Sequence, residues 1–138
     1  MMKHTILILF LFLSLLCHGQ SYKFFTTDRE LSSSLINKIY QDRNGMIWIA
    51  TEDGLNRYDG AKFITYKHDP ENEYSLCHNY VRVLYEDSKG RLFVGTYNGI
   101  QLYDPETDSF SARAQWEDGK TFDSNIMSIL ECRNGEIW

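Results

Sequence analysis

The sequence has no excess of basic residues, and this absence limits the partners that the protein can bind. Its 14 Lys and Arg residues are outnumbered by 19 Asp and Glu residues, which gives a formal net charge of −5 at pH 7. The acidic residues are spread along the chain and do not gather in a tail. A nucleic-acid-binding protein needs a basic patch or stripe that faces the phosphate backbone. We therefore expect no nucleic acid among its partners.

Signatures of helices, metal sites and cofactor sites are also missing. No stretch keeps a helical period for longer than a turn or two. The three cysteines form no Cys-x-x-Cys pair, and His68 and His78 have no accompanying pattern of further ligands. We expect surface histidines, no metal and no cofactor. Cys77 and Cys132 hold unlike positions in the repeat described below, so nothing in the pattern brings the two thiols together.

A hydrophobic run long enough to span a membrane is absent as well. The apolar run from Thr5 to Leu16 has 12 residues, whereas a transmembrane helix needs roughly 18 or more. Cys17 and Gly19 supply small residues at positions minus three and minus one of a cut before Gln20. We predict that residues 1–19 are a signal peptide and that the mature chain is exported. Lipidation at Cys17 is less favoured, because the preceding Leu16 is not small.

What the sequence does contain is a repeat. Residues 42–55 recur as residues 87–100, and a third copy runs from Cys132 to Trp138. Gly45, Gly90 and Gly135 mark a spacing of 45 residues. Self-similarity at this period indicates a stacked or radial repeat fold.

Within each repeat, short apolar segments alternate with turn signals, a pattern typical of an all-β fold. The expected strands of the first repeat are Leu35–Gln41, Ile47–Thr51, Leu55–Tyr58 and Phe63–Tyr66. Those of the second are Tyr80–Glu86, Leu92–Thr96, Ile100–Tyr103 and Phe110–Arg113. Four antiparallel strands in 45 residues make up one blade of a β-propeller.

The acidic residues of the repeat stand at turns. Asp42 and Asp87 each precede a glycine by three residues, where the carboxylate can cap backbone N–H groups. Asp53-Gly54 and Asn98-Gly99 are two-residue hairpin signals. Recurrence at symmetric turns favours a structural role for these residues over a catalytic one. We therefore expect no catalytic residues and no enzyme activity in this chain.

The strands at residues 47–50 and 92–95 are apolar at successive positions, so both of their faces must be buried. A blade between two other blades meets that requirement. Trp48, Phe93 and Trp138 hold the same place in three repeats, and we interpret this aromatic as packing between blades. The small Ala50 and Gly95 allow neighbouring sheets to approach closely.

Taken together, these motifs resemble the two-component regulator propeller repeat, which builds the periplasmic sensor region of hybrid two-component regulators, especially in the Bacteroidetes. The resemblance covers residues 24 to 138. It rests on the shared positions Asp42, Gly45, Trp48, Thr51, Gly54, Asp87, Gly90, Phe93, Thr96, Gly99, Gly135 and Trp138.

The resemblance implies a domain plan for residues 20–138. We expect a closing strand at 22–27, a first blade at 34–67, a second at 79–114 and the start of a third at 124–138. The closing strand would complete the last blade of a full ring. The kinase and DNA-binding parts of the family have no counterpart in this sequence, so we expect an N-terminal piece of an incomplete ring.

The function that the resemblance implies is the sensing of a ligand, a glycan, in the periplasm. The alternatives are a secreted binding module without signalling domains and, more remotely, part of a secreted glycan-active enzyme. The loops on the rim that carries the connections between blades hold our candidate oligosaccharide-binding residues: Glu52, Tyr74, Tyr97, Asn98 and Trp116. An ordinary solvated loop face is the competing interpretation. Open apolar blade faces also predict self-association of the chain.

Overall fold

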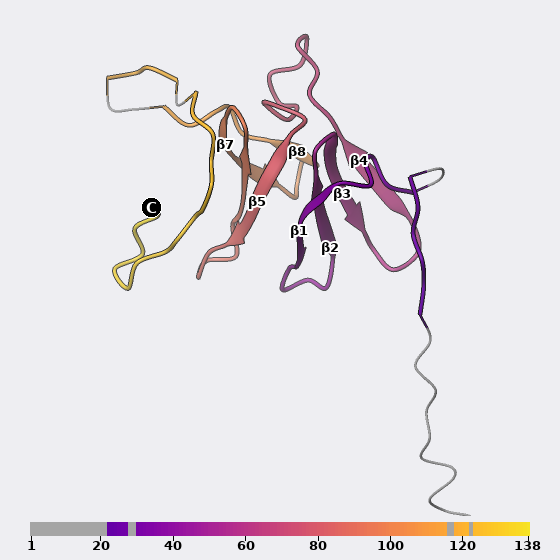
Figure 1. The fold of residues 1–138 in the computed structure, drawn as a ribbon. Helices are drawn as coiled ribbons and strands as arrows, with labels where there is room; N and C mark the ends of the chain where they lie inside the picture. Colours follow the sequence, from indigo (N-terminus) through magenta and orange to yellow (C-terminus); the bar gives the residue numbers. More distant parts are fainter. Residues whose placement is uncertain (1–21, 28–29, 116–117, 122) are drawn as a thin grey trace, which may run out of the picture.

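The computed structural model describes residues 22–27, 30–115, 118–121 and 123–138. The predicted signal peptide at 1–19 and the candidate Trp116 lie outside these residues. The described residues form two four-stranded antiparallel sheets and no helix (Figure 1). Within them, no helix is long and apolar enough to cross a membrane.

Each sheet is one blade whose strands follow chain order. Blade 1 consists of β1 (Ile36–Gln41), β2 (Ile47–Thr51), β3 (Gly54–Tyr58) and β4 (Phe63–Tyr66). Blade 2 consists of β5 (Val81–Glu86), β6 (Leu92–Thr96), β7 (Gly99–Asp104) and β8 (Ser109–Phe110). The all-β fold of four-stranded blades is confirmed.

Seven strands match the predicted bounds to within a residue at each end, and β8 is the exception. It was predicted at Phe110–Arg113 but ends at Phe110. The Ser111 side chain explains the early end, because its Oγ accepts the Leu102 N–H at 2.9 Å while the Ser111 N–H donates to the Leu102 carbonyl at 2.8 Å. A side chain thus takes a bond that a continuing strand would make through its backbone.

The predicted closing strand at 22–27 is not present, since residues 22–26 have no regular structure. This segment crosses the face of blade 1 that points away from blade 2. Phe25 packs there against Tyr58 and Phe63, with ring centroids 5.1 and 4.9 Å away. A strand needs a neighbouring strand to pair with. In the part of the chain that the structure describes, no free strand lies beside the segment. Phe25 therefore packs through its side chain, and the backbone makes no strand pairing.

Residues 124–129 run beside blade 2, and residues 130–138 form a narrow hairpin (Figure 1). Leu130 and Trp138 exchange two backbone hydrogen bonds of 2.7 Å, and Glu131 bridges to Ile137. The tight turn between them has Gly135 at φ +83°, a conformation that suits glycine. This is the position of a third repeat at the same spacing.

The turn carboxylates cap backbone N–H groups. Asp42 Oδ1 accepts the N–H groups of Asn44 and Met46, both at 2.9 Å, and its Oδ2 accepts the indole N–H of Trp48 at 2.8 Å. Asp87 repeats the arrangement with Lys89 and Arg91. The side chain at the start of each turn therefore ties it to the strand that follows.

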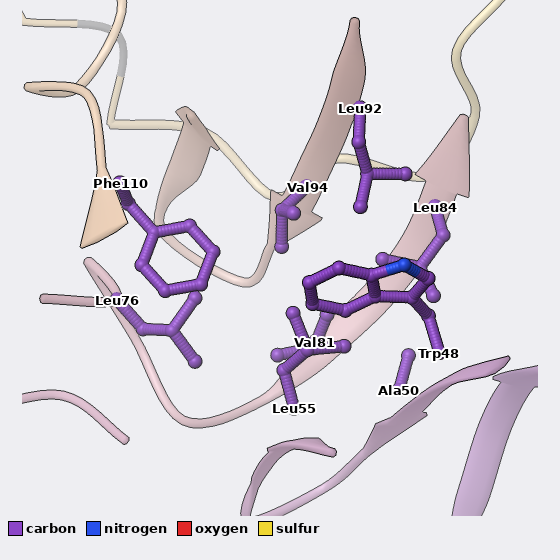
Figure 2. Close-up of a cluster of buried hydrophobic side chains, with 9 residues drawn as sticks. All are labelled: Trp48, Ala50, Leu55, Leu76, Val81, Leu84, Leu92, Val94 and Phe110. Atoms are coloured by element: carbon purple, nitrogen blue, oxygen red, sulfur yellow. The ribbon is translucent and has the colours of Figure 1, made fainter. Parts of the chain in front are cut away.

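The core lies between the two blades (Figure 2). Trp48 and Ala50 of β2 face Val81 and Leu84 of β5, and all four are buried. Trp48 is 1% exposed, and burial of such a side chain stabilises a fold by about 3–5 kcal/mol relative to alanine. Inter-blade packing thus holds for Trp48.

The equivalents of Trp48 are less covered. Phe93 is half-buried, and the Arg91 guanidinium lies 5.3 Å from its ring centre. Trp138 is 74% exposed. The aromatic residue at this repeat position is therefore fully buried only where a complete blade follows it.

The outer face of blade 1 is open along β1. Ile36 and Ile39 of β1 are 43% and 59% exposed, whereas the residues 45 positions later, Val81 and Leu84, are buried by blade 1. Ile36 and Ile39 therefore sit where a preceding blade would pack. Self-association through this face stays a prediction.

Two carboxylates, Glu86 at the end of β5 and Glu131 45 residues later, fasten neighbouring repeats. Glu86 accepts the Tyr40 hydroxyl at 3.0 Å and the Arg43 N–H at 3.1 Å, and it pairs with the Arg43 guanidinium at 2.6 Å. Its equivalent Glu131 accepts the Ser88 N–H at 2.8 Å and hydroxyl at 2.6 Å. We call this arrangement the carboxylate latch.

Gly95 leaves room for two side chains, Val83 of the paired strand β5 and Ile126 of the following repeat. A Cβ added there would lie 2.4 Å from Val83 Cγ1 and 2.7 Å from Ile126 Cγ2. We predict that Gly95→Ala lowers the free energy of unfolding by about 1–3 kcal/mol, through overpacking. In a Val83→Ala background the same change should cost at least about 0.5 kcal/mol less, because part of the clash is gone. Urea denaturation of the four variants measures both, and strictly additive losses would contradict the packing explanation.

The latch predicts a second stability change. The Glu86 side chain is 5% exposed, so Glu86→Ala leaves the Tyr40 hydroxyl and the Arg43 N–H without their acceptor. We expect a loss of about 1–3 kcal/mol in the free energy of unfolding. Glu106→Ala, at an exposed turn, serves as the matched control and should stay within about 0.5 kcal/mol of the parent. Equal losses in the two variants would show that the latch contributes nothing specific.

Candidate functional site

The candidate site lies at the end of the blades that carries the connection between them. Residues 52–53 and 97–98, which turn from the second to the third strand of each blade, are at this end together with the connection 67–79 (Figure 1). Backbone bonds join these parts, since the Gly54 N–H donates to the Asn79 carbonyl at 2.7 Å and the Tyr97 N–H to the Tyr80 carbonyl at 3.0 Å. Both blades therefore contribute to one surface.

Six side chains on this surface form what we call the rim cluster. Blade 1 contributes two of them, and blade 2 with its preceding connection contributes four. They are Asn37, Glu52, His78, Tyr80, Arg82 and Tyr97.

Tyr80 is at the centre of the rim cluster. Its hydroxyl donates to Glu52 Oε1 at 3.0 Å, and the nearby Asn37 amide donates to the Val81 carbonyl at 2.7 Å. Its backbone N–H donates to His78 Nδ1 at 2.9 Å. The hydrogen bond to the Glu52 carboxylate raises the pKa of Tyr80, so the phenol stays protonated. These contacts fix the ring relative to both blades.

The other rings and the cation surround Tyr80. The ring centre of Tyr97 lies 6.2 Å from that of Tyr80 and 5.6 Å from that of His78. The Arg82 guanidinium carbon lies 5.5 Å from the Tyr80 ring centre, a cation–π distance. Tyr97 is 56% exposed, so it presents ring surface to solvent.

Polar contacts hold the loops beneath the rim cluster. Asp53 accepts the Lys67 ammonium at 2.6 Å and the Asn79 amide at 3.1 Å, which ties the turn of blade 1 to the connection. Further along, Gln101 accepts the Cys77 N–H at 2.7 Å and is itself 3% exposed. Burial raises the pKa of the Cys77 thiol, whose Sγ lies 3.2 Å from the Thr96 hydroxyl. The connection that carries His78 is thus anchored at both ends.

The structure brings some of the predicted site residues together and separates others. Glu52 and Tyr97 both belong to the rim cluster. The N–H of Asn98 donates to Thr96 Oγ1 at 3.1 Å, as part of the turn. Tyr74 lies at β8, where it lines a different hollow with Leu102 and Phe110.

Sequence reasoning missed Tyr80, Arg82, His78 and Asn37 as site residues. The sequence pattern predicts a strand at Tyr80 and Arg82 and a surface position for His78. One signal could have identified two of them: Asn37, Arg82 and Met127 occupy equivalent positions 45 residues apart but differ completely in chemistry. Equivalent positions that the repeat does not keep alike are candidates for function rather than packing.

A second hollow, of about 320 Å³, lies between the connection 67–79 and residues 112–121. Its lining is polar and includes Asp69, Glu73, Gln101 and Arg113. Arg113 is already paired with Asp123 at 2.6 Å. This hollow lacks the aromatic rings of the rim cluster, and we assign it no role.

The rim cluster combines exposed aromatic rings, a carboxylate, an amide and a guanidinium. Aromatic rings can stack on the faces of sugar rings, while carboxylate and amide oxygens accept hydroxyl hydrogens. In the part of the chain that the structure describes, no group of three or more His, Cys, Asp or Glu side chains is placed to hold a metal ion. These groups suit the recognition of a ligand.

Comparison with known proteins agrees with the repeat and the fold. The model of the family described as two component regulator propeller matches residues 30–53 and 75–98. The two matches are offset by 45 residues, as are the blades. A curated relative, Histidine kinase P4 of Formosa agariphila, is 40% identical over 73 residues, which are 50% of this chain and 5% of that protein.

Two solved structures share the fold, and both are extracellular domains of hybrid two component systems from B. thetaiotaomicron. The first has a TM-score of 0.70 at 28% identity, and the aligned region is 84% of this chain and 17% of that structure's chain. The second has a TM-score of 0.68 at 22% identity, and the aligned region is 88% of this chain and 17% of that structure's chain. The chain thus spans a small part of the proteins that it matches. Residues 30–53 and 75–98 match the two-component regulator propeller repeat, and the chain folds into blades like those of the extracellular domains of hybrid two-component systems.

Proposed function

We propose that this chain is exported to the periplasm and forms part of a propeller that senses an oligosaccharide for a hybrid two-component system. The observation that carries the proposal is the rim cluster, in which groups from both blades meet at one exposed surface. Its rings and polar groups suit a saccharide, whose ring faces are apolar and whose edges carry hydroxyls.

Binding, rather than catalysis, is the role that the acidic residues support. Asp42 caps the first turn of blade 1, and Asp59 and Asp104 cap later turns of the blades through backbone N–H groups. Asp53 pairs with Lys67. Such carboxylates are engaged in structure. Glu52, the carboxylate of the rim cluster, accepts a hydroxyl and is placed to accept others.

The solved relatives are extracellular domains, which supports export. We expect residues 1–19 to be removed when the full coding sequence is expressed in a Gram-negative host. Mass spectrometry of the periplasmic fraction should give a mature chain that starts at Gln20. A chain of full length in the cytoplasm, or a lipid-modified Cys17, would contradict this part of the proposal.

Tyr97 provides the test of saccharide binding. The exported chain is titrated with a panel of neutral and acidic oligosaccharides, and affinity is measured by calorimetry and by saturation-transfer NMR. Tyr97→Ala should weaken binding of any saccharide that binds by about tenfold, because a stacking surface is lost. Tyr74→Ala is the matched control, since Tyr74 is equally exposed, at 55% against 56%, but lies outside the rim cluster. The proposal fails if no saccharide in the panel binds, or if the two substitutions weaken binding equally.

A further inference from the structure

Arg82 is the feature of the rim cluster that neither the fold nor hydroxyl recognition explains. Four other arginines of the two blades and their following loop each pair with a carboxylate. These pairs are Arg43 with Glu86, Arg57 with Asp108, Arg91 with Asp87 and Arg113 with Asp123. Arg82 is half-buried, and in the described part of the chain no carboxylate lies within ion-pair distance of it.

Arg82 stands at an irregularity in the pairing of β5 with β6. In β5, Val81 pairs with Thr96 and Val83 with Gly95, so the register shifts at Arg82 and leaves it outside the ladder. Blade 1 has the same shift in β1, at the equivalent Asn37. Such β-bulges redirect a side chain and are common beside functional sites. Both blades therefore turn this residue out of the sheet at the rim.

The guanidinium is held in place by a ring that is itself fixed. The Arg82 guanidinium lies over the Tyr80 ring, 5.5 Å from its centre, and the Tyr80 hydroxyl is bonded to Glu52 at 3.0 Å. A cation–π contact uses none of the guanidinium N–H donors for hydrogen bonding, and their fork geometry matches a carboxylate or a sulfate. The side chain is thus set for an anion that none of the described residues supplies.

We propose that the rim cluster binds an anionic saccharide, with the charged group on Arg82. This inference rests on the proposed function and narrows its ligand class. The Tyr97 and His78 rings would contact the sugar, and Glu52 and Asn37 would accept and donate hydrogen bonds to hydroxyls. Because the chain carries a net charge of −5, recognition of an anion needs a local cation such as this one. The anionic group is the carboxylate of a uronic acid or a sulfate ester.

The experiment compares matched probes on the full exported chain. Tetramers of galacturonate, of galactose and of sulfated galactose are titrated by calorimetry. At least one anionic tetramer should bind about tenfold more tightly than the galactose tetramer, and the affinity for it should fall as salt is raised. Preference for galacturonate or for sulfated galactose identifies the source of the anion.

Variants then assign the preference to Arg82. Arg82→Gln should weaken the anionic tetramer about tenfold or more and change the galactose tetramer by less than about threefold. Arg82→Lys should retain part of the preference, because it keeps the charge but loses the fork. Arg113→Gln, an arginine outside the rim cluster, should leave both affinities unchanged. Melting temperatures of all variants show whether each one is folded.

The outcomes separate the two proposals. Equal binding of neutral and anionic tetramers would overturn this inference and leave the proposed function standing. Equal weakening of both tetramers by Arg82→Gln would make Arg82 a structural residue and overturn the inference too. Failure of every saccharide to bind counts against the proposed function itself.

Discussion

The packing of one blade on the next is the interaction on which this structure depends. Each sheet is apolar on both faces, so neither face can be left to water without cost. Trp48 shows the result where a neighbour is present, since Val81 and Leu84 of blade 2 bury it almost completely. Trp138 shows the result where none is described, because the same kind of side chain is 74% exposed. Stability is therefore a property of the contact between repeats more than of a single blade.

Polar groups at both ends of the blades add direction to this non-directional packing. At one end the carboxylate latch joins the Glu86 side chain to Tyr40 and Arg43 of the preceding blade. At the other end the rim cluster joins Tyr80 to Glu52. Hydrogen bonds require specific distances and angles, whereas apolar contact does not. The two ends together thus set the register in which the apolar faces meet.

The sequence predicted what depends on local chemistry. Strands such as Ile47–Thr51 and Leu92–Thr96 agree exactly, because a turn aspartate and a glycine bound each of them. The missed features depend on partners distant in the chain. The strand expected at 22–27 has no sheet to join, and the bulge at Arg82 arises from the pairing of β5 with β6. Two site residues, Glu52 and Tyr97, were predicted from the sequence. Tyr80 was not, because the pattern placed it within a strand, and Tyr74 lies at β8, away from the rim cluster.

The arrangement of the rim cluster also bears on how tightly it can hold a ligand. Association loses affinity when loops and side chains must be ordered. The loops of the rim cluster are already ordered before a ligand binds. Asp53 ties the connection 67–79 to the turn of blade 1, and the hydroxyl of Tyr80, which precedes β5 of blade 2, donates to Glu52 of blade 1. The core between the blades in turn fixes the separation of Glu52 from Arg82 without either residue touching it. The packing of repeats that makes the fold possible is therefore also what prepares the surface for binding, and the few residues in which the repeats differ determine what binds there.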